Sequence, residues 1–500
     1  MTTKDTLRFV PIIVLTLLVP VGAQQANNEE FAKRQYDSGL SFLQNHRYAD
    51  AVKDLQGVAD SFPESTVADN ALLQIAEYQI DIAHNIEATQ KAVDRLLKDF
   101  ANSDSAPLAH VIAGRLALAK GRTQADIDSA MASYERVSRL FPGTEGVAAA
   151  GFYAGETLRT VRRVDEALDR YRRVRIEFPR SIWAARAAIG AGYCFVNQGN
   201  PQAALQEIQW ARQTFPNTPV ATDALNLNTI IYRLYVRAPA QPPFTFSGRI
   251  IGAAQANYSD VVGLRFEQDG RLLLGHKAGI AVFDEKGAVA ATVPAQEPSA
   301  FYVDANNRVV VARGSNLIAD KGPTQNLFVP DKDGKVRYLE EIPALLLRAQ
   351  GERLVSDYKD HSVARISSDG KYIGPFAKVA ALRMATNSMD EVAMLDKDTK
   401  SVFFSDRDSK ALGKLANKGT GYEFDEPVDI AFDAFDQLYV LDRGKGTVWV
   451  FAPKGNKLIT SLSIPEKSPG SFMKANAFSL DRAGRLFIFD ERIKRIQVYQ

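Results

Sequence analysis

The sequence predicts a multidomain α plus β chain, in which an all-α half is followed by an all-β half. Two observations predict this fold class. From Phe31 to about Arg237, apolar residues recur at helical spacing in a series of amphipathic runs, most of which end in Phe-Pro. From Phe244 to the C-terminus, short runs of β-branched and aromatic residues alternate with polar turns.

The helical half, residues 31–237, is built from an internal repeat. Phenylalanines end five successive runs at intervals of 38, 41, 37 and 37 residues. Eleven residues before the phenylalanine, four of the runs carry an alanine, which is small enough to let two helices approach closely. A period of this length predicts stacked helical hairpins. The phenylalanines are Phe62, Phe100, Phe141, Phe178 and Phe215, and the alanines are Ala51, Ala130, Ala167 and Ala204.

These repeats resemble tetratricopeptide (TPR) repeats of the long-period type found in bacterial periplasmic and outer-membrane-associated proteins. The resemblance rests on Phe62-Pro-Glu-Ser, Phe178-Pro-Arg-Ser and Phe215-Pro-Asn-Thr, which match the F-P-x-S/T form that follows the second helix of a unit. It implies a concave superhelix that holds peptides or other proteins. It does not imply which partner is held.

Residues 238–243 form a Pro-rich linker, and residues 244–500 form the β half. Three prolines in six residues predict a short, stiff spacer that holds the two halves apart. Six strand runs, with 37 to 48 residues between their ends, each predict the second strand of a four-stranded blade, and together a six-bladed β-propeller. The runs are Arg271–Gly275, Arg308–Ala312, Arg353–Asp357, Glu391–Asp396, Gln437–Asp442 and Arg485–Asp490.

The sequence also predicts how the ring closes. The chain ends at Gln500, just after the third strand of blade six, while the segment Phe244–Ile251 has no partner of its own. We expect this segment to complete blade six, because closure removes exposed strand edges.

Blades five and six resemble NHL repeats, on the runs Asp433–Asp442 and Asp481–Asp490. In that family an aspartate closes the second strand, and it is matched in four blades but not by Gly275 or Ala312. We expect these aspartates to accept hydrogen bonds from the turns that follow them. They are Asp357, Asp396, Asp442 and Asp490.

The first 23 residues predict a cleavable signal peptide. Lys4 and Arg8 precede an apolar run, and small residues at Gly22 and Ala23 suit a signal peptidase. The alternative is a membrane anchor, but the apolar run is shorter than the roughly 20 residues that span a bilayer. No cysteine follows the run, so the protein is not expected to be a lipoprotein. We therefore expect a periplasmic or secreted protein with a disordered start over residues 24–30.

The composition excludes several classes of function. A net charge of +2 gives no overall field that would attract nucleic acid. The single cysteine, Cys194, excludes an intrachain disulfide and a cysteine metal cluster, and its apolar helical surroundings predict inert core. No phosphate-binding loop, nucleophile elbow or zinc-protease motif is present. We expect proteins or peptides as partners, and an anionic envelope component as a further one.

Two basic regions are candidate partner surfaces. The first is an arginine cluster that could hold carboxylates or phosphates, although a solvated helix face with i,i+4 ion pairs also explains it. The second is the set of turns after the second strands of the propeller, where lysines also serve solubility. The cluster comprises Arg159, Arg162, Arg163, Arg170, Arg172, Arg173 and Arg175, and the turns carry Lys277, Lys359, His361, Lys397, Arg443 and Lys445.

Some propellers of this kind are enzymes, such as calcium-dependent lactonases and histidine-metal lyases. Here the propeller has two histidines, His276 and His361, which are fewer than the three ligands of most catalytic zinc sites. The sequence therefore predicts no catalytic residue, metal ligand or cofactor, while calcium in the central channel stays open. The function it favours is a non-enzymatic exported scaffold with two recognition surfaces. A metal-dependent, lactonase-like hydrolase or lyase and an envelope-assembly factor are the alternatives.

Overall fold

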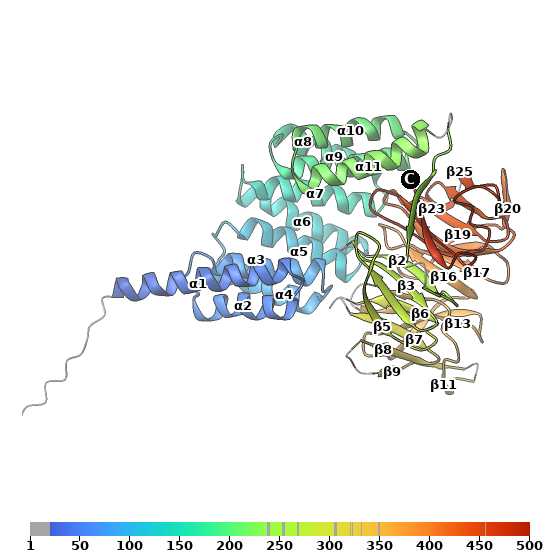
Figure 1. Ribbon diagram of the computed structural model, residues 1–500. Helices are drawn as coiled ribbons and strands as arrows, with labels where there is room; N and C mark the ends of the chain where they lie inside the picture. Colours follow the sequence, from blue (N-terminus) through green and yellow to red (C-terminus); the bar gives the residue numbers. More distant parts are fainter. Residues whose placement is uncertain are drawn as a thin grey trace, which may run out of the picture.

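The computed structural model describes residues 21–237, 241–252, 256–267, 270–304, 308–320, 322, 324–331, 333–348, 351–455 and 457–500. A helical half, blue to green in Figure 1, lies against a propeller that runs from yellow to red. The predicted signal peptide falls almost entirely outside the described residues and stays a prediction. Within the described ranges, no helix is both long and apolar enough to cross a membrane.

The helical half consists of five helical hairpins followed by one more helix and a short π-helical turn. Consecutive helices pack in pairs, α1 with α2 through α9 with α10. The bounds are α1 Val21–Gln44, α2 Tyr48–Ser61, α3 Ala68–Asp81, α4 Ile86–Asp99, α5 Ala106–Lys120, α6 Gln124–Leu140, α7 Glu145–Thr160, α8 Val164–Glu177, α9 Ile182–Asn197, α10 Pro201–Thr214, α11 Pro219–Ile231 and η1 Tyr232–Arg237.

The repeated phenylalanines end the second helix of every hairpin, as the sequence predicts. Phe62 follows α2 directly, and its backbone N–H donates to the carbonyl of Val58. The same bond, four residues back, is made by Phe100, Phe141 and the two later phenylalanines. The proline that follows most of them cannot continue the helix, so the chain turns back there.

Four of the five hairpins are packed through a glycine in their first helix, which the repeat pattern did not predict, whereas α3 contains no glycine. Tyr134 and Tyr171, four residues after the repeated alanines, lie against glycines of the helix before. A Cβ atom on Gly114 or Gly155 would come within 2.5 Å of the facing tyrosine ring. The two helices can therefore approach this closely only where no side chain intervenes.

The expected disordered start over residues 24–30 is corrected by the structure, because these residues lie in α1. Glu29 and Glu30 pair with Lys33 and Arg34 one turn later. Glu29 also accepts hydrogen bonds from the backbone N–H and the hydroxyl of Thr66, which lower its pKa to about 2. This segment is thus tied to the start of the next hairpin.

The β half is a six-bladed propeller, and all six predicted second strands are second strands. Blades one to six contain β2–β5, β6–β9, β12–β15, β16–β19, β22–β25 and β26–β28 with β1. The strands are β1 Phe246–Ile251, β2 Gly263–Phe266, β3 Leu272–His276, β4 Gly279–Phe283, β5 Val289–Pro294, β6 Ala300–Val303, β7 Val309–Arg313, β8 Asn316–Ala319, β9 Thr324–Asn326, β12 Leu345–Leu347, β13 Arg353–Asp357, β14 Ser362–Ile366, β15 Tyr372–Ala377, β16 Ala381–Thr386, β17 Val392–Asp396, β18 Val402–Ser405, β19 Ala411–Leu415, β22 Pro427–Phe432, β23 Leu438–Asp442, β24 Thr447–Phe451, β25 Leu458–Ser463, β26 Ala475–Leu480, β27 Leu486–Asp490 and β28 Arg495–Tyr499.

Two small hairpins stand outside the blades. The hairpin of β10 (Phe328–Pro330) and β11 (Val336–Tyr338) follows blade two, and that of β20 (Lys418–Gly419) and β21 (Tyr422–Glu423) follows blade four. The first of them lengthens the connection from blade two to blade three, where the sequence pattern is less regular than elsewhere.

The ring closes as predicted, through the first strand of the propeller. β1 pairs antiparallel with β28, with Phe246 opposite Tyr499 and Ile251 opposite Ile496. Thr245 and Gln500 exchange two backbone hydrogen bonds of 2.8 and 3.0 Å at the end of the ladder. Blade six is therefore assembled from both ends of the propeller sequence, and β28 is paired with a strand on each side.

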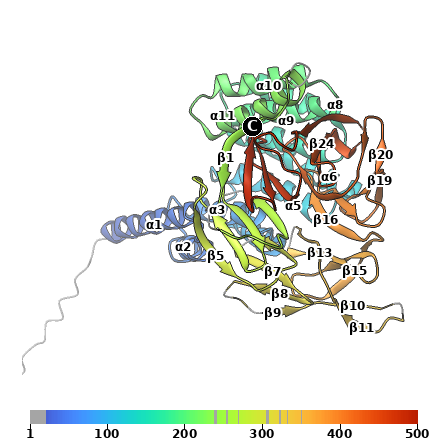
Figure 2. The same cartoon turned by 45° about the vertical axis from the view of Figure 1, so that its right-hand side comes forward.

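The superhelix covers one face of the propeller (Figures 1 and 2). Turns after the first and third strands open on this covered face, and turns after the second strand open on the opposite, open face, because successive strands are antiparallel. Arg122 donates to the carbonyl of Met389 and to Asp390 at 2.9 Å, in a first turn of blade four. Arg233 donates to the carbonyl of Gly484, 2.6 Å away, in the first turn of blade six.

The two halves share one hydrophobic core, which corrects the expectation that the linker holds them apart. Ile230 and Leu234, at the end of the helical half, are buried in the same cluster as Phe244, Phe435 and Tyr439 of the propeller. The burial of apolar area at this junction stabilises the contact between the two halves, even though the spacer contains three prolines. The chain therefore presents its helical and propeller surfaces in a fixed relative orientation.

Gly484 offers a test of this junction. Its φ of +68° is left-handed, and a Cβ there would lie 2.7 Å from Ile230. Gly270, at the same turn position in blade one, has a φ of +88° but open space around a Cβ. Both alanine variants carry backbone strain of about 1 kcal/mol. We expect Gly484→Ala to lose about 1–3 kcal/mol more in unfolding free energy, because it also overpacks the junction.

Urea denaturation of both variants beside the unmodified chain measures the difference. Equal losses for Gly484→Ala and Gly270→Ala would contradict the close approach of α11 to blade six.

Candidate binding sites

The odd-numbered helices form the inner layer of the superhelix and line a groove. α3 contacts α5, α5 contacts α7, and α7 contacts α9 in series. Half-buried aromatic side chains gather in this groove where α7 meets α9. The ring centroid of Trp183 lies 5.6 Å from that of Phe152 and 5.5 Å from that of Tyr153. These three aromatic side chains are only partly buried by the protein itself, so the groove presents an accessible aromatic surface.

Charged residues flank this aromatic surface. The guanidinium of Arg115 lies over the ring of Tyr153 at 4.6 Å, and that of Arg186 lies over Trp183 at 4.5 Å. Arg115 is paired with Asp81. Burial raises the pKa of Glu77 in the same part of the groove. The groove therefore combines apolar anchoring with charges of both signs, which suits an amphipathic peptide segment.

A cavity of about 480 Å³ joins this groove to the propeller. Its helical wall includes Glu156 and Tyr193, and its propeller wall includes Ala434 and Arg482 in the first turns of blades five and six. A second cavity, of about 690 Å³, lies farther along the contact between the two halves, beside the turn between α3 and α4. A ligand bound in the groove would therefore contact both halves of the chain.

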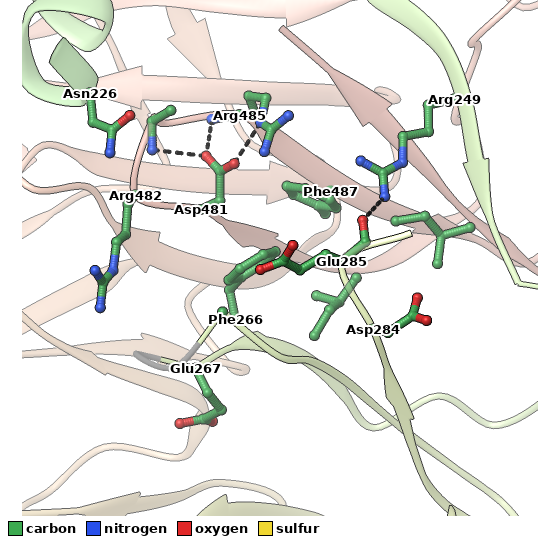
Figure 3. A pocket seen from close by; sticks show the side chains of 14 residues that line it. Asn226, Arg249, Phe266, Glu267, Asp284, Glu285, Asp481, Arg482, Arg485 and Phe487 are labelled. Atoms are coloured by element: carbon green, nitrogen blue, oxygen red, sulfur yellow. Dashed lines mark hydrogen bonds and ion pairs between the residues drawn. The ribbon is translucent and has the colours of Figure 1, made fainter. Parts of the chain in front are cut away.

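Another cavity, of about 500 Å³, lies on the covered face where blades one and six meet (Figure 3). The rings of Phe266 and Phe487 lie 5.1 Å apart within it. Asp481 accepts hydrogen bonds from its own turn and pairs with Arg485 at 2.6 Å, while Arg249 donates to the backbone carbonyl of Glu285. The bond from Arg249 and the contact between the two rings link blades one and six, while Asp481 acts within its own turn, and we assign this cavity to the closure of the ring.

The central channel is lined by the first strands and carries more positive than negative charge. Arg265 donates across the channel to the carbonyl of Leu345 at 3.4 Å. Arg383 faces Asp429, with 3.8 Å between Nε and Oδ1. Burial raises the pKa of Asp429 and lowers the pKa of Arg265. Two guanidinium groups against one carboxylate make this lining a poor environment for a divalent cation.

The two histidines of the propeller do not share a site. His276 is buried against the ring of Tyr258, with centroids 5.0 Å apart, and this burial lowers its pKa. His361 is exposed on blade three, where its Nδ1 lies 2.5 Å from Asp398. Among the residues that the structure describes, no group of three or more His, Cys, Asp or Glu side chains is placed to hold a metal ion.

The aspartates that close second strands act within the blades. Asp357 and Asp490 accept hydrogen bonds from the N–H groups two residues later, and Asp396 accepts one from Thr399, as expected. Asp442 instead accepts from Asp425 and Glu426, in the connection that enters its own blade. All four roles are structural.

Comparison with known proteins identifies a repeat family in part of the helical half. Residues 152–219 match the family model for the tetratricopeptide repeat. The helical half contains tetratricopeptide repeats. No curated protein matches the chain.

Several solved structures also show a distant likeness to about half of the chain. A streptogramin B lyase is 10% identical with a TM-score of 0.37, covering 51% of this chain and 97% of its own. A virginiamycin B lyase from Staphylococcus aureus is 13% identical with a TM-score of 0.35, covering 49% and 81%. A gluconolactonase from Xanthomonas campestris is 19% identical with a TM-score of 0.38, covering 52% and 98%. At these values, no activity is transferred to the present chain.

The arginine cluster of the tetratricopeptide half does not form one surface. Arg159 is buried and donates to Ser388 of the propeller, and Arg162 pairs with Glu391 there. Both residues contact the covered face of the propeller, Arg159 as a buried side chain and Arg162 with 43% of its side chain still exposed. The others lie along α8 or the turn before it, where Arg163 pairs with Glu166, Arg172 with Asp169 and Arg175 with Glu207, while Arg170 is half-buried and Arg173 exposed.

Cys194 of α9 is buried, and burial raises the pKa of its thiol to about 12, so it is inert core as expected.

The basic turns of the propeller all lie on the open face, away from the tetratricopeptide helices. Most of them have acidic partners contributed by other loops, so the face is mixed in charge rather than uniformly basic. Lys277 lies near Asp260 and Glu297, Lys359 pairs with Glu340, His361 with Asp398 and Arg443 with Glu426, while Lys397 lies over the ring of Tyr358 and Lys445 is exposed.

A buried carboxyl group supports the docking of the tetratricopeptide half. Asp433, in the first turn of blade five, accepts hydrogen bonds from Gln437 and Tyr439, and Gln437 in turn accepts one from Tyr235 of η1. Burial raises the pKa of Asp433 to about 7. Its protonated form is therefore favoured in the folded chain relative to the unfolded chain, in which the pKa is about 4.

This shift predicts a pH dependence. The stability that Asp433 contributes is complete below about pH 4 and is lost as the pH rises toward 7, because the folded state holds the proton over that window. Relative to the unmodified chain, Asp433→Asn should gain unfolding free energy from pH 4 to 7, by up to about 1.4 kcal/mol per unit of pKa separation. Urea denaturation between pH 4 and 8 measures this.

Asp481→Asn is the matched control, because Asp481 has the same turn position in blade six but pairs with Arg485. A pH-independent difference between Asp433→Asn and the unmodified chain would contradict the raised pKa.

Calcium provides a second test. Because the channel lining carries two guanidinium groups and one carboxylate, we expect millimolar calcium to leave the thermal unfolding midpoint unchanged. Differential scanning fluorimetry with calcium and then with a chelator measures this. A calcium-dependent rise that the chelator reverses would contradict the electrostatic argument, since only an ion that binds the folded state stabilises it.

Proposed function

We propose that the protein is a non-enzymatic scaffold that binds a peptide segment in its tetratricopeptide groove and a second partner on the open face of its propeller. The sequence of residues 1–23 supports export, and so a periplasmic or secreted location. Envelope assembly is one special case of this binding function.

The observation that carries the proposal is the accessible aromatic surface of the groove. Phe152, Tyr153 and Trp183 are only half-buried, although their contacts with one another place them at the centre of the inner layer. Tryptophan, tyrosine and arginine dominate the binding energy of protein interfaces, because they bury large areas at low entropic cost. Their arrangement here is suited to a ligand that completes the burial.

The charges narrow the chemistry of that ligand. Among the described residues, the exposed Arg186 has no ion-pair partner, and its guanidinium is held in place over Trp183. Arg115 and Asp81 form an ion pair at the other end of the aromatic surface. A segment with an apolar anchor and a nearby carboxylate would satisfy both the aromatic surface and Arg186.

The fixed orientation of the two halves supports a scaffold with two partners. One partner in the groove and another on the open face would lie on opposite sides of the propeller. A chain of two separately tethered domains would hold its partners over a range of distances. The shared core around Ile230 and Phe435 instead sets a single geometry, so binding raises the effective concentration of one partner near the other.

Peptide selection tests the groove. Peptides are selected from a random display library on the immobilised chain and then measured by fluorescence anisotropy. We expect Trp183→Ala combined with Arg186→Ala to weaken their binding at least tenfold, which is about 1.4 kcal/mol. Arg173→Ala, an exposed arginine on the outer helix α8, is the control and should bind like the unmodified chain.

Selected peptides that bind the groove variant as tightly as the unmodified chain would overturn the proposal for the groove. Failure to enrich any peptide would overturn it as well.

A further inference from the structure

The open face has a cavity of about 390 Å³ at the mouth of the central channel. Blades four and five supply most of its wall, and the cavity lies above the channel residue Arg383. We call it the channel mouth. Its volume is in the range of pockets that take a small molecule or one or two residues of a peptide.

Four cationic side chains and two carboxylates border the channel mouth. Glu426 is paired with Arg443, with 2.9 Å between Nε and Oε2. Asp396 accepts hydrogen bonds from the backbone of Ala380 and from both the backbone and the hydroxyl of Thr399. Both carboxylates are thus fully engaged by other groups. They leave little negative charge for the remaining cations of the mouth.

The two lysines of the channel mouth contact neutral groups, whereas Arg383 faces Asp429. Lys397 lies over the ring of Tyr358, with its Nζ 4.5 Å from the centroid. Lys400 donates to the backbone carbonyl of Asp425 at 2.5 Å. Asp398, beside Lys397 in sequence, is engaged by His361. The net charge at this point is positive, and Arg265 within the channel adds to it.

The floor of the channel mouth is apolar. Val261, Leu382 and Val428 contribute to it, and the two valines are almost completely buried. Asn476, which is nine-tenths buried, borders the same cavity. Its Nδ2 donates to Glu491, while its Oδ1 is buried without a donor among the described residues. Because this oxygen is shielded from the cavity, recognition at the channel mouth rests on the lysines and the apolar floor.

We propose that the channel mouth binds a carboxylate attached to an apolar group. Lys397 and Lys400 take the carboxylate, and the apolar floor takes the hydrocarbon part. The C-terminal residue of a peptide and a free N-acyl amino acid both have this chemistry. The inference deepens the open-face part of the proposed scaffold function and rests on that part alone, so it does not depend on the groove.

Calorimetric titration of the full chain at low ionic strength tests this site. The probes are N-acetyl-leucine and its neutral analogue N-acetyl-leucinamide. We expect N-acetyl-leucine to bind with a millimolar or smaller dissociation constant, and the amide to bind at least tenfold more weakly. Lys397→Gln combined with Lys400→Gln should lower the affinity for the acid at least tenfold.

Lys359→Gln is the matched control. Lys359 lies on the same face but outside the channel mouth, paired with Glu340, so this variant should keep the affinity for the acid. A six-residue peptide ending in leucine, with a free or an amidated C-terminus, distinguishes the two sources. Tighter binding of the free peptide than of N-acetyl-leucine identifies a chain terminus, and weaker binding identifies a small free acid.

Three results would overturn the proposal. They are no binding of N-acetyl-leucine at 10 mM, equal binding of acid and amide, and equal losses in the double variant and in Lys359→Gln. None of these results bears on peptide binding in the tetratricopeptide groove, which is tested separately through Trp183 and Arg186.

Discussion

The pairing of β1 with β28 is the contact on which the rest of the structure depends. It closes the ring, because blade six has only three strands without it. It also fixes where the chain leaves the helical half, since Phe244 precedes β1 and is buried in the core that contains Ile230 and Leu234. One strand therefore determines both the closure of the propeller and the position of the tetratricopeptide helices on its covered face.

This docking divides the charged residues between two different tasks. On the covered face, arginines of the helices bind carbonyl groups and carboxylates of the first turns, as Arg122 and Arg233 do. On the open face, lysines of the second turns pair with acids from neighbouring loops or contact neutral groups. Basic residues at the covered face thus hold the two halves together, whereas those on the open face are available for the proposed recognition.

The sequence predicted the architecture because the relevant signals are local. A phenylalanine that ends a helix, a proline that follows it and a turn between alternating strands each act within a few residues. The closing strand was also predictable, since Phe244–Ile251 had no other partner. The glycines that face Tyr134 and Tyr171 were not predicted, because each lies in the preceding helix, 20 and 16 residues before its partner, and no local pattern links the two positions.

The candidate sites were less predictable because their partners are distant in sequence. Arg159 and Arg162 appeared as part of a local cluster, but their partners Ser388 and Glu391 lie in the propeller. The turns of the open face were placed correctly by strand alternation, yet the acids that neutralise them were not identified. Lys359 pairs with Glu340, which belongs to the connection before blade three. No motif marks such pairs, since only the closed ring brings them together.

The docked arrangement also links the groove to the propeller thermodynamically. The cavity beside Glu156 and Tyr193 has Ala434 and Arg482 in its opposite wall. A ligand that fills it contacts both halves only when they are docked, so its binding must stabilise the docked state. By reciprocity, any change that loosens the junction must weaken that ligand. A partner on the open face touches neither wall, and it can therefore bind without competing for the groove.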